Sequence, residues 1–211
     1  MGTEIPAAAP ARLAGAGREK ALFKPSRHSL WDIATVVAVS VWCNCLIMSA
    51  IAAALLFPAM RALNPSLPEY QSVAADQHWL IAAGQPQQEI FKVVNVITIA
   101  CMAMCLAGTV VRLRRQALPR ALGALIAVTL LLGIVRSAYV MPHMFADAGR
   151  YWSAARAGDM ATAAPLRERF DRWHTPASRL LSAEAIAALA TFVSLLATGL
   201  PHRRSDNEGR A

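Results

Sequence analysis

The sequence predicts an all-α membrane protein: a bundle of four transmembrane helices, with short interfacial helices in the two outer loops. Of the 211 residues, 56% are hydrophobic and only 16% are charged, and the mean hydropathy is +0.39. A soluble domain carries about 25% charged residues. The many alanines and few aromatic residues favour helices over sheets. This composition excludes an ordinary soluble globule, and also a disordered chain, which needs low hydrophobicity.

Four apolar segments are each long enough to cross a bilayer, for which a helix needs about 20 apolar residues. The first two segments contain no charged residue, the third contains only Arg136 and the fourth only Glu184. We therefore predict a transmembrane domain over residues 31–200. Its predicted spans are 33–57, 93–111, 121–140 and 180–200.

The positions of lysine and arginine predict that both termini are cytoplasmic, because cytoplasmic flanks of membrane helices are enriched in these residues. Basic residues cluster before the first span, between the second and third spans, and after the fourth. Residues 1–30 are predicted to be a mobile basic tail and residues 201–211 a second cytoplasmic tail. The loop after the third span is also rich in arginine, and we place it outside because four spans require it. We predict a multi-pass protein of a bacterial-type inner membrane.

The net charge of +8 is compatible with this topology and does not indicate a nucleic-acid partner. Basic cytoplasmic flanks meet anionic lipid headgroups, which accounts for much of the excess charge. The predicted partners are the lipid bilayer and either further copies of the chain or a larger membrane complex.

The outer loops contain two candidate interfacial helices. Ser66 to Glu69 has the pattern of a capping box with a proline in the first turn, and it predicts a short helix over Tyr70–Ala83 that ends near Gly84. Pro165–Trp173 places apolar residues on one helical face and charged residues on the others. That pattern is typical of a helix lying in the headgroup region.

All the cysteines lie inside predicted spans, so they do not form an extracellular disulfide framework. Sulfur ligands suit copper(I) and similar thiophilic metals. One hypothesis is therefore a soft-metal site between the first two spans. The alternative is that these side chains only pack. The candidate ligands are Cys43, Cys45, Cys101, Cys105, Met48 and Met104.

Arg136 and Glu184 are ionisable residues inside predicted spans, where charges are costly and usually face the bundle interior. Each lies a few residues from the outer end of its span. Because these spans are antiparallel, the two residues are at similar depth. We predict an ion pair that joins the third and fourth spans, and we favour a structural role for it over a substrate site.

His143 follows the third span and His174 precedes the fourth. Two axial histidines can hold a b-type haem in a four-helix bundle. Such ligands normally lie within the helices, whereas these lie at helix ends, so haem is a further alternative. Histidines bonded to loop carbonyls are the commoner case.

Two short stretches carry a family resemblance. The third span ends in Tyr139-Val-Met-Pro142, and the approach to the fourth contains Phe170, His174 and Ser178. This resembles the DUF-type family of four-span membrane proteins that includes the transmembrane-protein-205-like group. In that family an aromatic-x-x-Pro ends the third span and Phe-x-x-x-His-x-x-Ser leads into the fourth, although here the serine lies one residue later. The resemblance implies an integral membrane protein without an established reaction, some members being linked to resistance to thiophilic metal drugs.

The favoured interpretation is a non-enzymatic membrane protein, either a structural or accessory component or a small transporter-like unit. No phosphate-binding loop, zinc-protease signature or nucleophile elbow occurs in the sequence. No catalytic residue and no cofactor are assigned. Copper-like metal handling and a haem-carrying redox subunit remain the alternatives.

Overall fold

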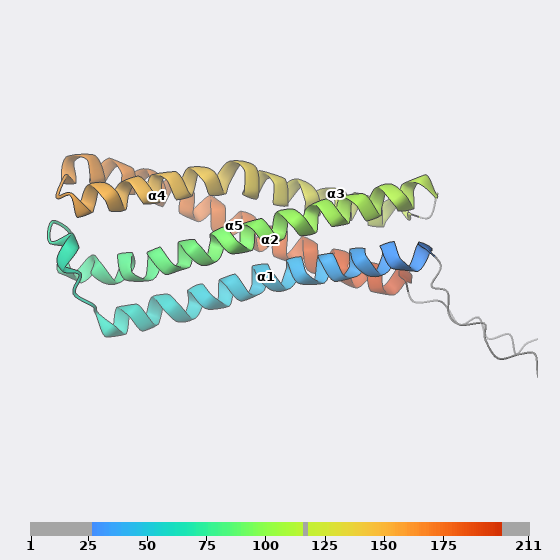
Figure 1. Cartoon of the computed structure of the whole chain (residues 1–211), viewed down its shortest axis with the longest axis horizontal. Coiled ribbons are helices and arrows are strands. Elements are labelled where there is room, and N and C mark those ends of the chain that lie inside the picture. Colours follow the sequence, from blue (N-terminus) through green and yellow to red (C-terminus); the bar gives the residue numbers. More distant parts are fainter. Residues whose placement is uncertain (1–26, 116–117, 200–211) are drawn as a thin grey trace, which may run out of the picture.

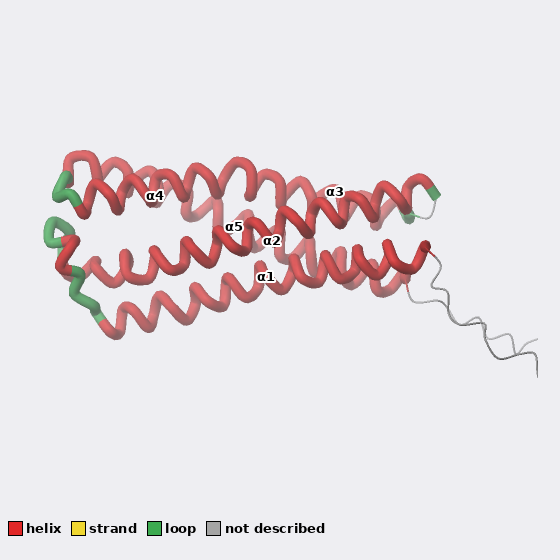
Figure 2. The backbone as a smooth tube through the Cα atoms, viewed as in Figure 1, coloured by secondary structure: helices red, strands yellow, loops and turns green. Residues whose placement is uncertain are grey.

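The computed structural model describes residues 27–115 and 118–199, which form an all-helical bundle (Figures 1 and 2). The predicted tails fall almost entirely outside the described residues. The elements in chain order are α1 (Arg27–Leu63), the 3₁₀ turns η1 (Pro68–Tyr70) and η2 (Ala75–Gln77), α2 (His78–Arg114), α3 (Arg120–Ile134), the π-helical segment η3 (Val135–Val140), α4 (Met141–Arg156) and α5 (Met160–Gly199).

Within the described residues, four helical stretches are long and apolar enough to cross a membrane, which confirms the predicted fold class. They are Leu30–Leu63, Ala75–Arg114, Arg120–Arg156 and Met160–Thr198. Each is longer than the predicted span inside it. The 37 residues of α1, for example, extend about 55 Å at 1.5 Å per residue, whereas the hydrocarbon core is about 30 Å thick. The helices therefore exceed the hydrocarbon thickness.

The bundle has two distinct ends (Figure 1). The start of α1, the end of α5 and the junction between α2 and α3 lie together at one end, called here the terminal end. Residues 64–77 and the turn at 157–159 lie at the other, called the cap end. Helix α1 packs along α2, α4 packs along α5, and α5 also contacts α1 and α3.

Polarity in this bundle is reversed relative to a soluble protein. Large apolar side chains such as Leu55, Val96 and Ile186 are about 70% exposed. Among the fully buried side chains are Arg136 and Glu184, together with several threonines. Where hydrocarbon replaces water, apolar groups can face outward and polar groups are placed inside, where they find partners. The arrangement is that of a protein surrounded by lipid.

The threonine hydroxyls show how the polar interior is satisfied. Thr98, Thr109 and Thr129 each donate to the carbonyl four residues earlier, at 2.7–2.9 Å. Thr129 Oγ1 also lies 2.9 Å from Thr191 Oγ1, which joins α3 to α5. These threonine hydroxyls are therefore all paired, whereas Ser137 Oγ is buried without a partner among the described residues.

The helix that begins at Arg120 does not end at Pro142, contrary to the expectation from the Tyr139-to-Pro142 pattern. It continues through η3 and α4 to Arg156. A proline lacks an N–H and its ring clashes with the carbonyl four residues earlier. The chain accommodates Pro142 by widening just before it, and Met141 N–H donates to the carbonyl of Arg136, five residues earlier. This π-helical segment contains Arg136 itself.

The two predicted interfacial helices are not found as separate elements. Leu67, not Ser66, precedes the first turn of η1, and no side chain caps that turn. Residues 70–77 form only short turns, and α2 runs through Gly84 without ending. Pro165–Trp173 is part of the continuous helix α5. This stretch packs laterally against α4 and the residues of the cap end, and that packing stabilises it as a helix. Helix α5 therefore extends beyond the predicted span 180–200.

Two residues in the left-handed region mark the turns at the cap end. Asn64 ends α1 with φ 43°, and its N–H donates to the Met60 carbonyl at 3.0 Å. Asparagine is, after glycine, the residue that most readily adopts this conformation at a helix end. Gly158, with φ 77°, lies between α4 and α5. The turn at each position reverses the chain direction.

Asp159 caps the start of α5, and its contribution to stability is expected to depend on pH. Hydrogen bonds from Thr162, including its N–H at 3.1 Å, hold the pKa of the Asp159 carboxyl below its usual 3.8. A group with a lowered pKa stabilises the fold above its ordinary pKa and loses that contribution as the pH falls through the folded-state value.

We therefore expect the melting temperature of the wild type to fall more steeply below about pH 4 than that of Asp159→Asn, which keeps an uncharged cap. Melting curves in detergent between pH 7 and pH 2 measure the difference. Parallel curves for the two proteins would show that the carboxylate contributes nothing at this helix start.

Candidate functional site

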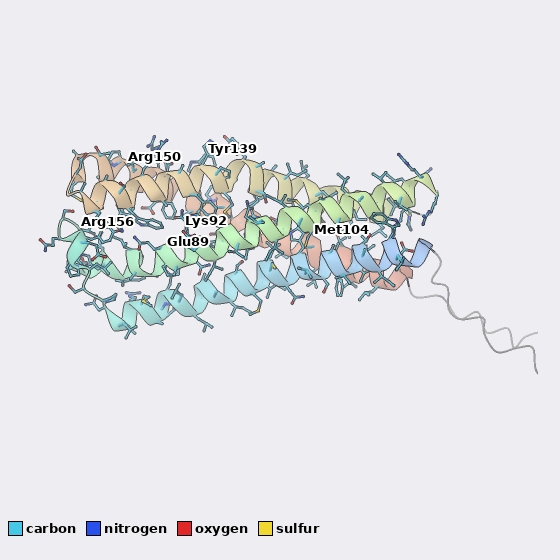
Figure 3. All side chains as sticks on the ribbon, viewed as in Figure 1. Glu89, Lys92, Met104, Tyr139, Arg150 and Arg156 are labelled. Atoms are coloured by element: carbon cyan, nitrogen blue, oxygen red, sulfur yellow. The ribbon has the colours of Figure 1, made fainter. Side chains whose placement is uncertain are left out.

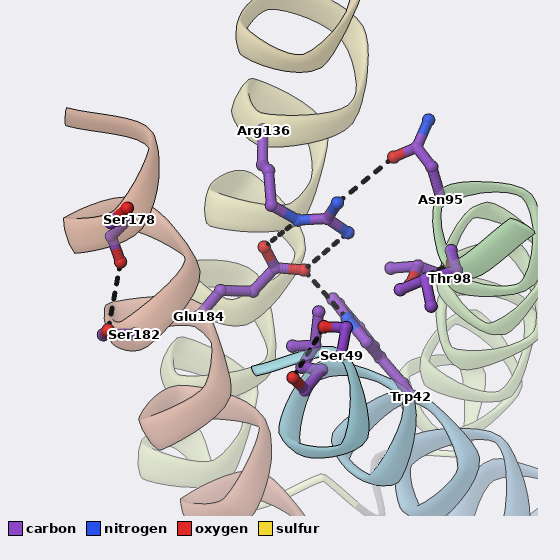
Figure 4. A network of polar contacts seen from close by, with 10 residues as sticks. Trp42, Ser49, Asn95, Thr98, Arg136, Ser178, Ser182 and Glu184 are labelled. Carbon is purple, nitrogen blue, oxygen red and sulfur yellow. Dashed lines mark hydrogen bonds and ion pairs between the residues drawn. The ribbon is translucent and has the colours of Figure 1, made fainter. Parts of the chain in front are cut away.

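A buried polar cluster joins four helical segments in the middle of the bundle (Figure 4). Arg136 Nε donates to Glu184 Oε2 at 2.5 Å, and Arg136 Nη2 donates to Oε1 at 3.3 Å. Trp42 Nε1 donates to Glu184 Oε1 at 2.9 Å, and Arg136 Nη1 donates to Asn95 Oδ1 at 3.2 Å. The structure thus brings Arg136 and Glu184 together and adds Trp42 from α1 and Asn95 from α2.

Every charged group in this cluster has a partner. Both side chains of the ion pair are completely buried, and each carboxylate oxygen of Glu184 accepts at least one hydrogen bond. A charge in a low-dielectric interior is tolerated when it is paired and hydrogen-bonded in this way. The cluster therefore holds the four helices in one arrangement, and neither charge is free to bind an ion.

A cavity of about 550 Å³ lies between the two helix pairs, toward the cap end. A second cavity of about 310 Å³ adjoins it and shares lining residues that include Trp152 and Phe170. The larger cavity is lined by α1, α2, α4 and α5, and none of its lining residues is charged. Ligand pockets in proteins are commonly 300–1,000 Å³ and mostly apolar, so this space has the size and character of a binding site.

Two glutamines beside the larger cavity have buried amide oxygens without hydrogen-bond partners in the described residues. Gln87 and Gln88 line it and are 4% and 9% exposed. Within the described residues, neither Gln87 Oε1 nor Gln88 Oε1 has a partner. Gln87 Nε2 donates to the Ser49 carbonyl at 3.2 Å, which fixes that side chain against α1. Unpaired buried acceptors are costly and are rarely left in a native interior.

The cap end is closed by a cluster centred on Tyr70, which is fully buried. Its hydroxyl accepts hydrogen bonds from Gln85 at 2.7 Å and Arg156 at 2.9 Å, and the Arg156 guanidinium also lies 5.3 Å from the ring centre. His78 Nδ1 accepts from Leu67 N–H, while Nε2 lies 3.0 Å from the Tyr70 carbonyl. This pattern requires the neutral tautomer with its proton on Nε2.

The candidate soft-metal ligands do not form one centre. Cys101 packs in a cluster with Trp42, whereas Cys105 packs in a different cluster with Leu122. Met48 and Met104 are 59% and 41% exposed, so their thioethers lie at the periphery of the bundle. In the part of the chain that the structure describes, no group of three or more His, Cys, Asp or Glu side chains could hold a metal ion.

The two histidines proposed as haem ligands lie in different environments. His143 Nδ1 is 2.6 Å from the Tyr139 carbonyl, and its ring lies tilted against the rings of Tyr139 and Trp173, with centroids 4.9 Å and 5.7 Å away. His174 lines both of the adjoining cavities described above, whereas His143 lines a separate surface hollow. They are therefore not arranged as an axial pair.

The residues of the family-like motif separate into two groups. Phe170, His174 and Ser178 are spaced four apart on α5 and all line the larger cavity. Tyr139 is 54% exposed and contacts Trp173 edge-on, and Pro142 lines the hollow beside His143. Figure 3 labels Tyr139 on the ribbon near the middle of the bundle and Arg156 near the cap end.

Sequence reasoning did not select several residues that shape these sites. Trp42 has an indole N–H in the middle of a span, and such a group needs a partner, which could have identified it. The adjacent pair Gln87 and Gln88 interrupts a largely apolar stretch next to the second predicted span. Gly133 carried no recognisable signal, because only its three-dimensional neighbours reveal its role.

Comparisons with known proteins identified no relative of this chain. No protein-family model, no curated protein and no solved structure matches the chain. The resemblance to the four-span DUF-type family therefore stays a prediction.

Proposed function

We propose that this chain is a non-enzymatic accessory or structural protein of a bacterial-type inner membrane. The observation that supports this role is the saturated ion pair of Arg136 and Glu184. Its partners from α1 and α2 fix the relative positions of the helices. A transporter that used these charges would need at least one of them to exchange partners with its substrate. The fixed, fully partnered arrangement favours a scaffold over a transport site.

We further propose that the terminal end faces the cytoplasm and the cap end faces the other side. At the terminal end, Arg112 pairs with Asp32 at 2.8 Å, and Arg114 and Arg115 are exposed, as expected next to anionic headgroups. This orientation also requires arginines at the cap end, and several of those have local partners. Arg61 lies over the Trp79 ring, Arg156 bonds Tyr70, Arg167 bonds Gln77, and Arg169 pairs with Asp147.

An accessory protein needs a neighbour in the membrane, and the lipid-facing side chains offer a way to find it. We propose to place a photo-crosslinking amino acid at Val96, Leu131 or Ile186, which are 61–70% exposed on three different helices. Irradiation of intact membranes is expected to give a discrete protein adduct from at least one position. Lipid adducts alone at all three, with a monomeric protein in mild detergent, would contradict the accessory role.

The same preparation distinguishes the metal and haem alternatives. Purification in mild detergent followed by metal analysis is expected to give less than one equivalent of copper and no Soret absorption. One equivalent of copper, lost in Cys101→Ser/Cys105→Ser, would favour the soft-metal alternative instead. A Soret band lost in His174→Ala would favour the haem alternative.

A further inference from the structure

Large exposed apolar side chains are concentrated on the terminal side of the bundle. On α2 the first of them is Ile90, and on the continuous helix of α3 and α4 the last is Tyr139. These two residues lie at similar depth, because Arg136 bonds Asn95 close by. We therefore place the cap-side edge of the hydrocarbon layer near Ile90 and Tyr139. Beyond it, within the described residues, such side chains occur only at Ile51, Leu55, Leu63 and Met160.

The bundle beyond this edge has the polarity of a soluble protein. Its buried cluster, centred on Tyr70, is apolar, and its surface carries charged side chains such as Arg150 and Arg156 (Figure 3). From Tyr139 to Trp152 the helix rises about 20 Å at 1.5 Å per residue, whereas the headgroup layer is only about 5–8 Å thick on each side. Residues 64–89 and 140–179, with the end of α1, therefore form a part that projects from the lipid, called here the projecting part.

The two adjoining cavities lie in the projecting part and change in polarity along their length. The larger cavity reaches the membrane edge at Phe91 and Leu181, is mostly apolar and has no charged lining residue. The smaller cavity lies nearer the cap end, where Gln77, Arg167 and Asp171 line it. The joined space is thus apolar beside the membrane and charged at its far end.

The larger cavity opens sideways between α1 and α5. Ala54 and Pro58 on α1, and Ser178 and Ser182 on α5, line the cavity and are also exposed. Ser182 lies near the membrane edge, only two residues from Glu184 of the central cluster. A hydrocarbon chain can therefore pass from the bilayer into the cavity without crossing water.

The position and the polarity of this space limit what can fill it. An apolar cavity that opens above the membrane exposes apolar surface to water unless a hydrocarbon group covers it. The molecules that adjoin the opening are the lipids of the cap-side leaflet. Their headgroups point away from the membrane centre and their chains point toward it. The joined space has the same order of polarity, with charge at the cap end and apolar walls at the membrane edge.

We propose that the joined cavities bind an acyl chain of a phospholipid raised from the cap-side leaflet, with its headgroup toward Arg167 and Asp171. Arg167 Nε lies 3.9 Å from Asp171 Oδ2, and both side chains are partly exposed, so this end can accept a polar group. The site goes beyond the proposed accessory role, and it neither uses nor disturbs the ion pair of Arg136 and Glu184.

A photoactivatable lipid tests this assignment in the full chain. The protein is reconstituted in vesicles of phosphatidylethanolamine and phosphatidylglycerol with a trace of phosphatidylethanolamine that carries a mid-chain diazirine. After irradiation and trypsin digestion, we expect lipid adducts on peptide 151–156, which contains the cavity residue Trp152 and lies wholly in the projecting part. Peptide 157–167 is the internal control, because it lines neither cavity before Arg167, although Met160 is exposed. No adduct on 151–156, or equal labelling of both peptides, would overturn the proposal.

Two neighbouring alanines of α1 give a matched pair of variants. Ala53 lines the larger cavity, whereas Ala52 lines a separate hollow. Ala53→Phe fills the cavity and is expected to abolish the adduct on peptide 151–156, whereas Ala52→Phe should keep it. Adducts on peptide 93–112, which faces the lipid at Val96, should persist in both variants.

The melting temperature of each variant shows whether it is folded. If Ala53→Phe does not fold, Ala54→Leu, a smaller intrusion at an exposed lining position, takes its place. A folded cavity-filling variant that keeps full labelling of peptide 151–156 would contradict the cavity as the place where the chain binds.

Discussion

Replacing Arg136 by methionine is expected to lower the free energy of unfolding by about 3–5 kcal/mol. The substitution leaves the Glu184 carboxylate fully buried, and among the described residues Trp42 Nε1 is its only remaining side-chain donor. Asn95 Oδ1 also loses its donor. Thermal or denaturant unfolding in detergent, followed by circular dichroism, measures the change.

The double variant Arg136→Met/Glu184→Leu separates loss of the pair from loss of volume. It contains no buried charge, so we expect it to be destabilised by less than the sum of the two single variants, with a coupling of about 2 kcal/mol or more. The exposed pair of Lys92 and Glu89, at 2.7 Å, is the matched control: Lys92→Met should cost less than about 1 kcal/mol. Additive single effects at Arg136 and Glu184 would show that the buried pair is not a coupled unit.

Replacing Gly133 by alanine is expected to destabilise the bundle by about 1–3 kcal/mol through overpacking. A Cβ at this position would lie 2.6 Å from Met102 Sδ and 2.8 Å from Trp42 Cζ2. The methionine can move, but the Trp42 ring is fully buried and bonded to Glu184, so moving it disturbs the central cluster. The same unfolding measurement applies.

Gly149→Ala is the control for this substitution. Nothing lies within 4 Å of a Cβ at Gly149, and alanine has the higher helix propensity by about 1 kcal/mol, so stability should hold or rise. In a Met102→Ala background, Gly133→Ala should cost less stability than it does in the wild type, because the closest contact of the new Cβ is gone. If Gly133→Ala were as stable as Gly149→Ala, the close approach of α1, α2 and α3 around this glycine would be wrong.

The fold could be predicted because it depends on length and polarity alone. Four apolar runs separated by basic flanks leave little freedom in a bilayer, and the depth of Arg136 and Glu184 followed from counting residues along antiparallel helices. The ends of the helices could not be predicted in this way. Pro142 and Gly84 look like helix ends in sequence, but packing in the cap end and one π-helical segment carry the helices past them.

The candidate binding site could be predicted only in fragments. Phe170, His174 and Ser178 were singled out by spacing, and they do share a cavity wall. Their partners Gln87, Gln88 and Trp152 come from other helices, and which faces of α2, α4 and α5 meet is set by packing. The cysteines show a further limit of the sequence pattern: Cys101 and Cys105 share a helix face, but the structure packs them in different clusters.

The topology of the chain in the membrane tests the central claim most directly. We propose to introduce single cysteines at Ser66 and Gly158 at the cap end, and at Arg115 at the terminal end, in a background in which the four native cysteines are replaced by serine or alanine. A membrane-impermeant maleimide added to intact spheroplasts should label the first two positions, and the third only after the membrane is opened. Labelling of Ser66 and Arg115 variants from the same side would contradict a bundle that crosses the membrane four times.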